Sequence, residues 1–123
     1  MTRWKSEVPT EYAEQVKLAE YLDRKGYCWC HVPNGGNRDA VTGAKLKKQG
    51  VKPGVPDVII FDVPFRYIND YPGIAIELKR KNGHPSDLTE KQEDWLYKLA
   101  KTNWLTKVAF GADEAIDWLE QIF

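Results

Sequence analysis

Two short strings carry residues that could do chemistry together: Pro56-Asp57 at the start of one apolar run, and Glu77-Leu78-Lys79 at the end of the next. In a strand, side chains two positions apart share a face, so Glu77 and Lys79 point the same way. If the two runs pair as antiparallel strands, Asp57 lies beside them. Two carboxylates this close oppose each other's ionisation unless a hard divalent cation sits between them.

Mg²⁺ or Mn²⁺ held by Asp57 and Glu77 would supply the chemistry of phosphodiester hydrolysis. Such a cation lowers the pKa of water, neutralises a phosphate oxygen and stabilises the charge that develops as a P–O bond breaks. Lys79 could then orient the water or hold the phosphate. The same residues also fit a surface Glu–Lys pair on an edge strand, with Asp57 in a turn after Pro56. The short strings alone do not choose between these interpretations.

Hydrophobic periodicity predicts the elements that must position these residues. Residues 57–61 and 74–79 are apolar and rich in β-branched side chains, and residues 27–32 and 104–110 are similar, so four strands are expected. A helical period over residues 10–25 predicts a first helix, begun by Pro9-Thr10 and ended by Gly26. The Thr89 to Gln92 string fits a capping box before a second helix, and Asp113 is expected to cap a third.

The connecting segments complete a predicted order of αβββαβα. The string Asn34-Gly35-Gly36-Asn37 predicts a loop that runs to about Pro53. Residues 63–72 contain two prolines and three aromatic residues, which indicates an excursion longer than a tight hairpin turn. The fold class is therefore α/β, with a central mixed sheet flanked by helices. We expect one domain over residues 1–123.

Composition narrows the possible functions. The 123 residues suit one domain, and 18 Lys plus Arg against 18 Asp plus Glu exclude a uniformly basic nucleic-acid coat. No stretch approaches the roughly 20 apolar residues of a membrane span, and the first residues lack the apolar run of a signal peptide, so a cytosolic protein is expected. Cys28 and Cys30 match no paired-cysteine zinc pattern and are interpreted as ordinary half-buried cysteines.

A local basic patch is the second functional feature. Within residues 31–52, where no acidic residue follows Asp39, four lysines gather near several glycines, and they are Lys45, Lys47, Lys48 and Lys52. Arg80 and Lys81 add positive charge beside the proposed catalytic strand, whereas the last helix is acidic. These cations are predicted to bind DNA phosphates. A lysine-rich loop that simply faces solvent is the alternative interpretation.

The combination of these strings resembles a known group of nucleases. The core order αβββαβ, with Pro56-Asp57 and Glu77-Leu78-Lys79, resembles the restriction-endonuclease-like PD-(D/E)XK superfamily. The run from Lys48 to Asp57 contains Gly54-Val55-Pro56-Asp57, and together with Glu77-Leu78-Lys79-Arg80 and the later Gln92 it resembles the virus-type replication-repair nuclease (VRR-NUC) family. The resemblance spans roughly residues 11–110.

Family likeness implies further site residues. Members show a helical Glu four residues before a Gln, which implies Glu11 before Gln15 as a third metal ligand. Glu14 competes for that role because its spacing is nearer to that of archaeal Holliday junction resolvases, and Glu20 is a weaker candidate; we favour Glu11. The Leu78 carbonyl is expected to complete the metal site. Gln92 is implied to face Lys79 or the water, although its capping-box position also explains it.

The resemblance implies a Mg²⁺- or Mn²⁺-dependent DNA endonuclease that leaves 5′-phosphate and 3′-hydroxyl ends. With no domain for reading bases expected, selectivity should come from DNA shape, and four-way junctions are the favoured substrate. Cutting a two-fold symmetric junction predicts a homodimer, with Phe65, Tyr67 and Tyr71, or Trp29, as possible interface residues. The alternatives are a nuclease for flaps, nicks or RNA, and a DNA-binding module without turnover.

Overall fold

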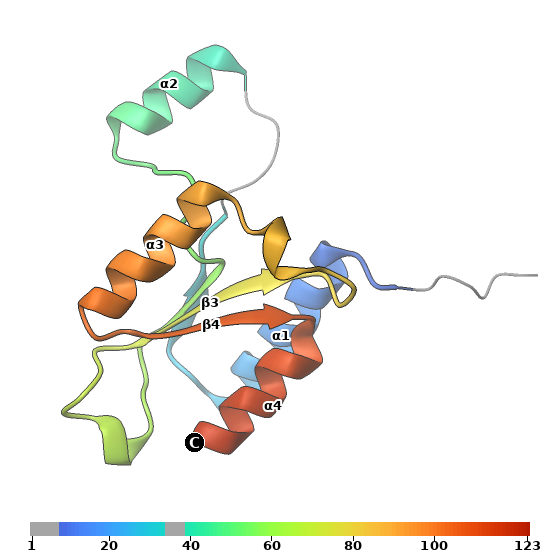
Figure 1. The fold of residues 1–123 in the computed structure, drawn as a ribbon, viewed down its shortest axis with the longest axis vertical. Helices are drawn as coiled ribbons and strands as arrows, with labels where there is room; N and C mark the ends of the chain where they lie inside the picture. The colour runs from blue at the N-terminus through green and yellow to red at the C-terminus, as the bar shows by residue number, and fades with distance from the viewer. Residues whose placement is uncertain (1–7, 34–38) are drawn as a thin grey trace, which may run out of the picture.

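A four-stranded mixed sheet forms the centre of the computed structural model, which describes residues 8–33 and 39–123 (Figure 1). The strands, in the order in which they lie side by side, are β1 (Trp29–His31), β2 (Val58–Ile60), β3 (Ile74–Lys79) and β4 (Leu105–Phe110). The pairs β1–β2 and β2–β3 are antiparallel, and β3–β4 is parallel. The expected α/β class with a mixed sheet is confirmed.

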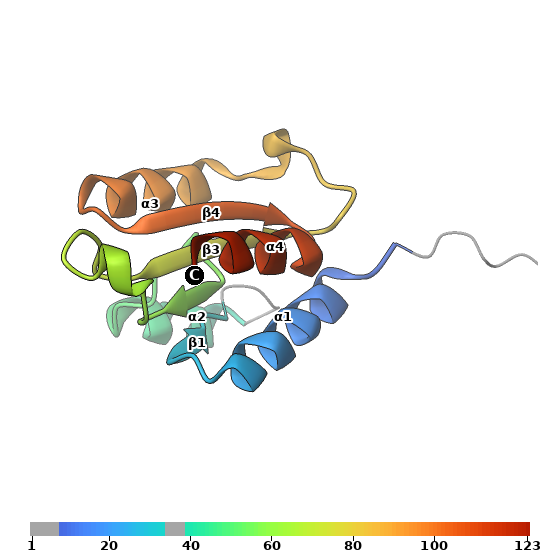
Figure 2. The ribbon, with the colours of Figure 1, turned by 90° about the horizontal axis from the view of Figure 1, so that it is seen from below.

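Helices cover both faces of the sheet. They are α1 (Glu11–Lys25), α2 (Ala40–Lys48), α3 (Glu90–Lys101) and α4 (Ala112–Ile122). Helices α1 and α4 pack against each other on one face, and α3 lies on the other (Figure 2). The predicted limits of α1 hold, because the Thr10 side chain accepts a hydrogen bond from the Ala13 N–H and Gly26 ends the helix in the left-handed conformation at φ 78°.

The core lies between the sheet and the α1–α4 pair. Its largest members have less than 2% of their surface exposed, and they are Leu18, Leu22, Val58, Ile60, Ile74, Ile76, Leu78 and Leu119. Two alanines of α4, Ala112 and Ala115, are also fully buried, and their small side chains let this helix lie close to α1 and the sheet. Strand β3 is buried along most of its length, so the polar residues at its end stand on a rigid support.

Strand register brings the Pro56-Asp57 string and the Glu77-Leu78-Lys79 string together. Val58 pairs with Ile76 in an antiparallel ladder. Asp57, one residue before Val58, therefore lies opposite Glu77, one residue after Ile76. The Asp57 carbonyl is fixed from the other side, since it accepts a hydrogen bond from the Val32 N–H at 2.8 Å and lies 2.8 Å from His31 Nδ1. The expected excursion between β2 and β3 is present and includes the 3₁₀ turn Phe65–Tyr67.

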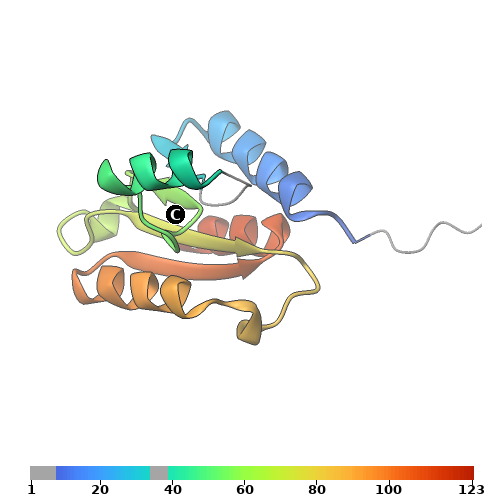
Figure 3. The ribbon, with the colours of Figure 1, turned by 90° about the horizontal axis from the view of Figure 1, so that it is seen from above.

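The predicted loop from residue 34 to about residue 53 is wrong over much of its length, because it contains α2. Asp39 begins this helix by accepting a hydrogen bond from the Thr42 N–H at 2.7 Å, and three lysines in the last turn favour its negative end. The glycine-rich string at 34–37 lies outside the described residues. No residue of α2 is buried, and the helix lies outside the main layers (Figures 1 and 3).

The expected cap of the last helix is also corrected. Gly111, at φ 99°, is the N-cap residue of α4 and offers no side-chain cap, whereas Asp113 lies in the first turn and pairs with Lys17 at 2.7 Å. The buried Ala112 N–H instead donates to Glu14 Oε1 at 2.9 Å. A carboxylate from α1 thus satisfies the first turn of α4, which periodicity within one helix cannot reveal.

This contact predicts different consequences for the two competing glutamates of α1. Glu14→Ala should lower the free energy of unfolding by about 2 kcal/mol, because it leaves the buried Ala112 N–H without an acceptor. Glu14→Gln keeps an oxygen acceptor and should retain most of that stability. Glu11→Ala removes an exposed side chain and should change stability little. Urea denaturation of the three variants measures the difference, and equal losses for Glu11→Ala and Glu14→Ala would refute this role of Glu14.

No helix among residues 8–33 and 39–123 is long and apolar enough to span a bilayer.

Candidate active site

Asp57 and Glu77 meet at the edge where β2 begins and β3 ends. Asp57 Oδ2 accepts a hydrogen bond from the Leu78 N–H at 2.7 Å, which fixes the Asp57 carboxylate against β3. The Glu77 carboxyl is hydrogen-bonded to Asp57, and the Glu77 residue is only 1% exposed. Two acidic groups from separate strands therefore share one small, largely buried space.

Burial first, and then the charge and hydrogen bond of Asp57, raise the pKa of Glu77 to about 9. The Glu11 carboxylate contributes a smaller part of this rise, and the nearby Lys79 ammonium opposes it. Glu77 is therefore protonated at neutral pH in the protein without bound cations.

Lys79 and Gln92 form the polar contact beside the carboxylates. Lys79 Nζ donates to Gln92 Oε1 at 2.9 Å and lies 4.0 Å from Glu77 Oε2. The same Gln92 oxygen accepts a hydrogen bond from the Thr89 N–H at 2.9 Å, while the Gln92 N–H donates to Thr89 Oγ1. The capping and the lysine-facing interpretations of Gln92 both describe real contacts.

Glu11, Asp57 and Gln92 line one hollow of about 580 Å³, together with Pro53, Gly54, Thr89, Glu90 and Lys91. Neither Glu14 nor Glu20 is among its lining residues. Glu14 is 5% exposed and is engaged with α4, which leaves Glu11 better placed to face the Asp57–Glu77 pair. The choice of Glu11 as a ligand stays a prediction.

Gly54 explains how the loop before Asp57 can approach α3. A Cβ on Gly54 would lie 2.7 Å from the Lys91 carbonyl carbon and 2.9 Å from Lys91 Cβ, and Gly54 has a φ of 89°. Only glycine accommodates both the close contact and the left-handed conformation. The contact of Gly54 with Lys91 thus holds the loop that leads to Asp57 against the beginning of α3, where Gln92 lies.

The chemistry of the donor set fits a hard divalent cation. Glu77 Oε1 is buried without a hydrogen-bond partner in the described structure, and an unpaired buried carboxylate oxygen is unfavourable unless something compensates it. Within residues 8–33 and 39–123, however, no three His, Cys, Asp or Glu side chains are already arranged to hold a metal ion. Asp57 and Glu77 are hydrogen-bonded to each other instead, so holding a cation requires this contact to open.

The predicted DNA-binding residues divide into separate groups. Lys47 and Lys52 line a second hollow of about 390 Å³, with Gly43, Leu46, Val51, Pro53 and Lys91, and Lys45 and Lys48 are exposed on α2. Arg80 donates instead to the carbonyls of Pro9, at 3.3 Å, and Val8. Sequence reasoning overlooked Lys91, although it adjoins Gln92 within the capping box.

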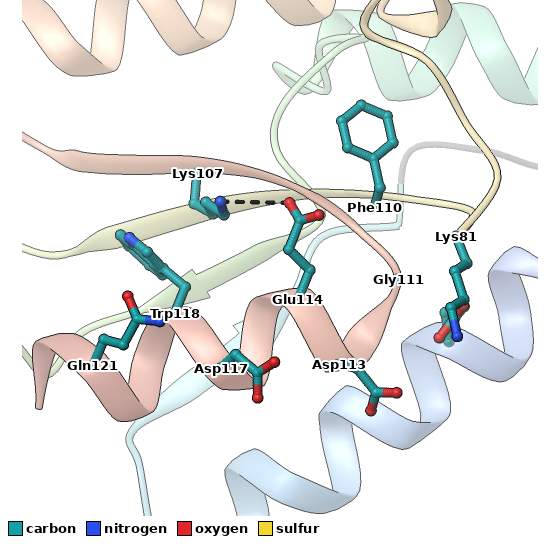
Figure 4. A pocket seen from close by; sticks show the side chains of 10 residues that line it. Lys81, Lys107, Phe110, Gly111, Asp113, Glu114, Asp117, Trp118 and Gln121 are labelled. Carbon is teal, nitrogen blue, oxygen red and sulfur yellow. Dashed lines mark ion pairs between the residues drawn. The ribbon is translucent and has the colours of Figure 1, made fainter.

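Lys81 lies elsewhere, in a hollow of about 520 Å³ formed by β4 and α4 (Figure 4). Its walls include Glu14 and three carboxylates of α4, at Asp113, Glu114 and Asp117, and Glu114 pairs with Lys107 at 3.4 Å. The acidic surroundings of Lys81 repel phosphate, so the geometry does not group this lysine with those of α2.

The raised pKa of Glu77 predicts a pH-dependent stability. In the folded protein Glu77 keeps its proton up to about pH 9, whereas an ordinary Glu releases it near 4.5. Protonated Glu77 therefore contributes on the order of a few kcal/mol to the free energy of unfolding. This contribution is fully present below pH 4.5 and is lost as pH rises through about 9. The pKa values of Asp39, Asp113 and Glu120 are lowered, so these residues change the pH dependence of stability only below about pH 4.5.

Denaturant unfolding in EDTA between pH 5 and 9 measures this effect. Wild-type stability should fall relative to that of Glu77→Gln, which carries no titrating group at this position. Parallel stability curves for the two proteins would show that Glu77 does not hold its proton in the folded state.

Comparison with known proteins places this geometry in a family. The family model of the VRR-NUC domain matches residues 9–113. A solved structure described as a VRR_NUC domain protein superposes with a TM-score of 0.75 and 27% sequence identity, covering 96% of this chain and 91% of its own. A search of curated proteins gave no match.

Proposed function

The chain belongs to the VRR-NUC family of nucleases, and from that premise we propose that it is a metal-dependent endonuclease of branched DNA, with four-way junctions as the favoured substrate. One observation carries the proposal. Asp57, Glu77, Lys79 and Gln92 converge from β2, β3 and α3, beside a hollow that also contains Glu11.

The carboxylates of Glu11, Asp57 and Glu77, with the Leu78 carbonyl, would hold Mg²⁺ or Mn²⁺. When bound, the cation supplies Lewis acidity that makes water more acidic and offsets negative charge on phosphate. Within the chain, Gln92 fixes Lys79 Nζ at 2.9 Å, so the ammonium is positioned to hold the scissile phosphate or the attacking water. Water oxygen bonds to phosphorus, the P–O3′ bond breaks, and the ends are 5′-phosphate and 3′-hydroxyl.

The contacts that the described surface offers support selection by DNA shape rather than by base sequence. Lys45, Lys47, Lys48 and Lys52 are point charges, which bind phosphates without reading base edges. A protein that binds through phosphates distinguishes DNA molecules by shape and flexibility. We therefore place these lysines on the arms of a junction, and we assign no phosphate contact in this geometry to Lys81.

A homodimer would present two active sites to the opposite strands of a junction. Of the aromatic residues expected at an interface, Phe65 is 88% exposed, whereas Tyr67 packs edge-on against Tyr71 and is held under Arg66. Trp29 is packed against the core and donates to Asp23 Oδ1. Phe65 is therefore the residue that we place in the interface.

A substrate panel tests the proposed function. Four-way junction, flap, nicked duplex, linear duplex and RNA are incubated with the protein in Mg²⁺, Mn²⁺ or EDTA, with Asp57→Asn as control. Preferred cutting of the junction by the wild type in either metal, and none by the variant, supports the proposal. Preferred cutting of flaps or nicks would show that one of these, and not the four-way junction, is the substrate. Binding without cleavage in either metal would indicate a DNA-binding module.

A further inference from the structure

The hollow between α2 and the start of α3 is a second feature of the active-site surface. It adjoins the hollow of Glu11, Asp57 and Gln92, because Pro53 and Lys91 line both. The two hollows, together called the groove below, therefore lie next to each other along the wall formed by Pro53 and Lys91. Lys91 is part of the wall of both hollows.

The charge of this second hollow has one sign. Lys47, Lys52 and Lys91 line it without any acidic lining residue, and none of the three forms an ion pair with another described residue. Some lysines elsewhere, such as Lys17 and Lys107, are instead paired with carboxylates. Unpaired ammonium groups around a concave surface attract an anion.

We propose that this hollow is a binding subsite for a DNA phosphate next to the scissile one, and that Lys91 is its principal contact. The inference rests on the proposed nuclease function and extends it, because it requires the substrate strand to continue past the cut toward α2. Lys91 is a substrate-binding residue here, since it holds a phosphate of the strand while Lys79 and the carboxylates act on the reacting phosphate.

Lys91→Ala tests the subsite without disturbing its wall. Gly54 packs against the Lys91 backbone and Cβ, and alanine keeps both. Fluorescence anisotropy with a four-way junction in EDTA should show binding weakened about 3- to 10-fold at 0.1 M salt, with the slope of log affinity against log salt reduced by about one. Single-turnover cleavage at enzyme concentrations below saturation should fall by the same factor as binding.

Lys101→Ala is the matched control. It removes one positive charge from the same helix, about 15 Å along and on another face, where Lys101 lies over the Tyr97 ring. This control should keep the wild-type salt slope. Melting temperatures of both variants exclude loss of folding. If Lys91→Ala and Lys101→Ala bind alike, the subsite is refuted.

A neutral methylphosphonate placed at each phosphate around the cut identifies the contact directly. A methylphosphonate at one phosphate beside the cut should weaken binding by the wild type. The same substitution should have no further effect on binding by Lys91→Ala, because that variant has already lost the contact between the Lys91 ammonium and this phosphate. Equal effects in both proteins at every position refute the contact while leaving the nuclease function intact. A wild type that neither binds nor cuts any DNA overturns both proposals.

Discussion

Replacing Glu77 with glutamine is expected to lower DNA cleavage at least about 10³-fold while leaving binding of the same DNA unchanged or tighter. Glutamine keeps the size of the buried side chain, which is 1% exposed, but removes a carboxylate from the proposed cation site. In EDTA at neutral pH Glu77 carries a proton, so glutamine replaces one uncharged group with another and does not weaken the attraction for DNA. Single-turnover cleavage in Mn²⁺ and anisotropy in EDTA measure the two properties separately.

The matched control is Glu114→Gln, which removes a carboxylate from α4, where it pairs with Lys107 outside the proposed groove. This variant should cut DNA at the wild-type rate. A Glu77→Gln protein that folds normally and still cuts DNA would place the reaction elsewhere. Loss of binding together with cleavage would instead indicate that Glu77 organises the surface rather than the chemistry.

Much of the fold is predictable because the responsible interactions are local. The apolar run of β3, the Thr10 and Gly26 caps and the Thr89–Gln92 capping box each lie within or beside a single element. The missed α2 is different: its only larger apolar side chains, Val41 and Leu46, are five positions apart, so it lacks the apolar stripe by which helices are recognised. Its Asp39 cap was the available signal, outweighed by the glycines before it.

Long-range contacts explain what the sequence could not reveal about the site. The α4 cap comes from Glu14, 98 residues away, so a carboxylate that resembles a candidate ligand is already engaged. The close approach of Gly54 to Lys91 likewise depends on how β2 and α3 are placed. By contrast, the proximity of Asp57 and Glu77 follows from antiparallel pairing alone, which the sequence made a testable prediction.

Lys79→Met is expected to lower cleavage by about 10²- to 10³-fold, because methionine fills similar space without an ammonium group. Gln92→Ala should have a smaller effect, about 10-fold, since Lys79 remains but loses the acceptor that holds it at 2.9 Å. If Gln92 acts through Lys79, adding Gln92→Ala to Lys79→Met should cause no further loss. Single-turnover rates of the single and double variants measure this coupling.

The capping role of Gln92 must be separated from its contact with Lys79. Thr89→Ala removes the Oγ1 acceptor for the Gln92 N–H and should destabilise the protein by about 1 kcal/mol, yet it leaves the Lys79–Gln92 hydrogen bond in place. It should therefore keep most of the cleavage rate. Gln92→Glu retains an oxygen acceptor and should rescue much of the activity that Gln92→Ala loses. If Thr89→Ala and Gln92→Ala reduce cleavage equally, Gln92 acts through stability. If the double variant shows additive losses, Gln92 acts independently of Lys79, because a positioning residue has no effect once the group it positions is gone.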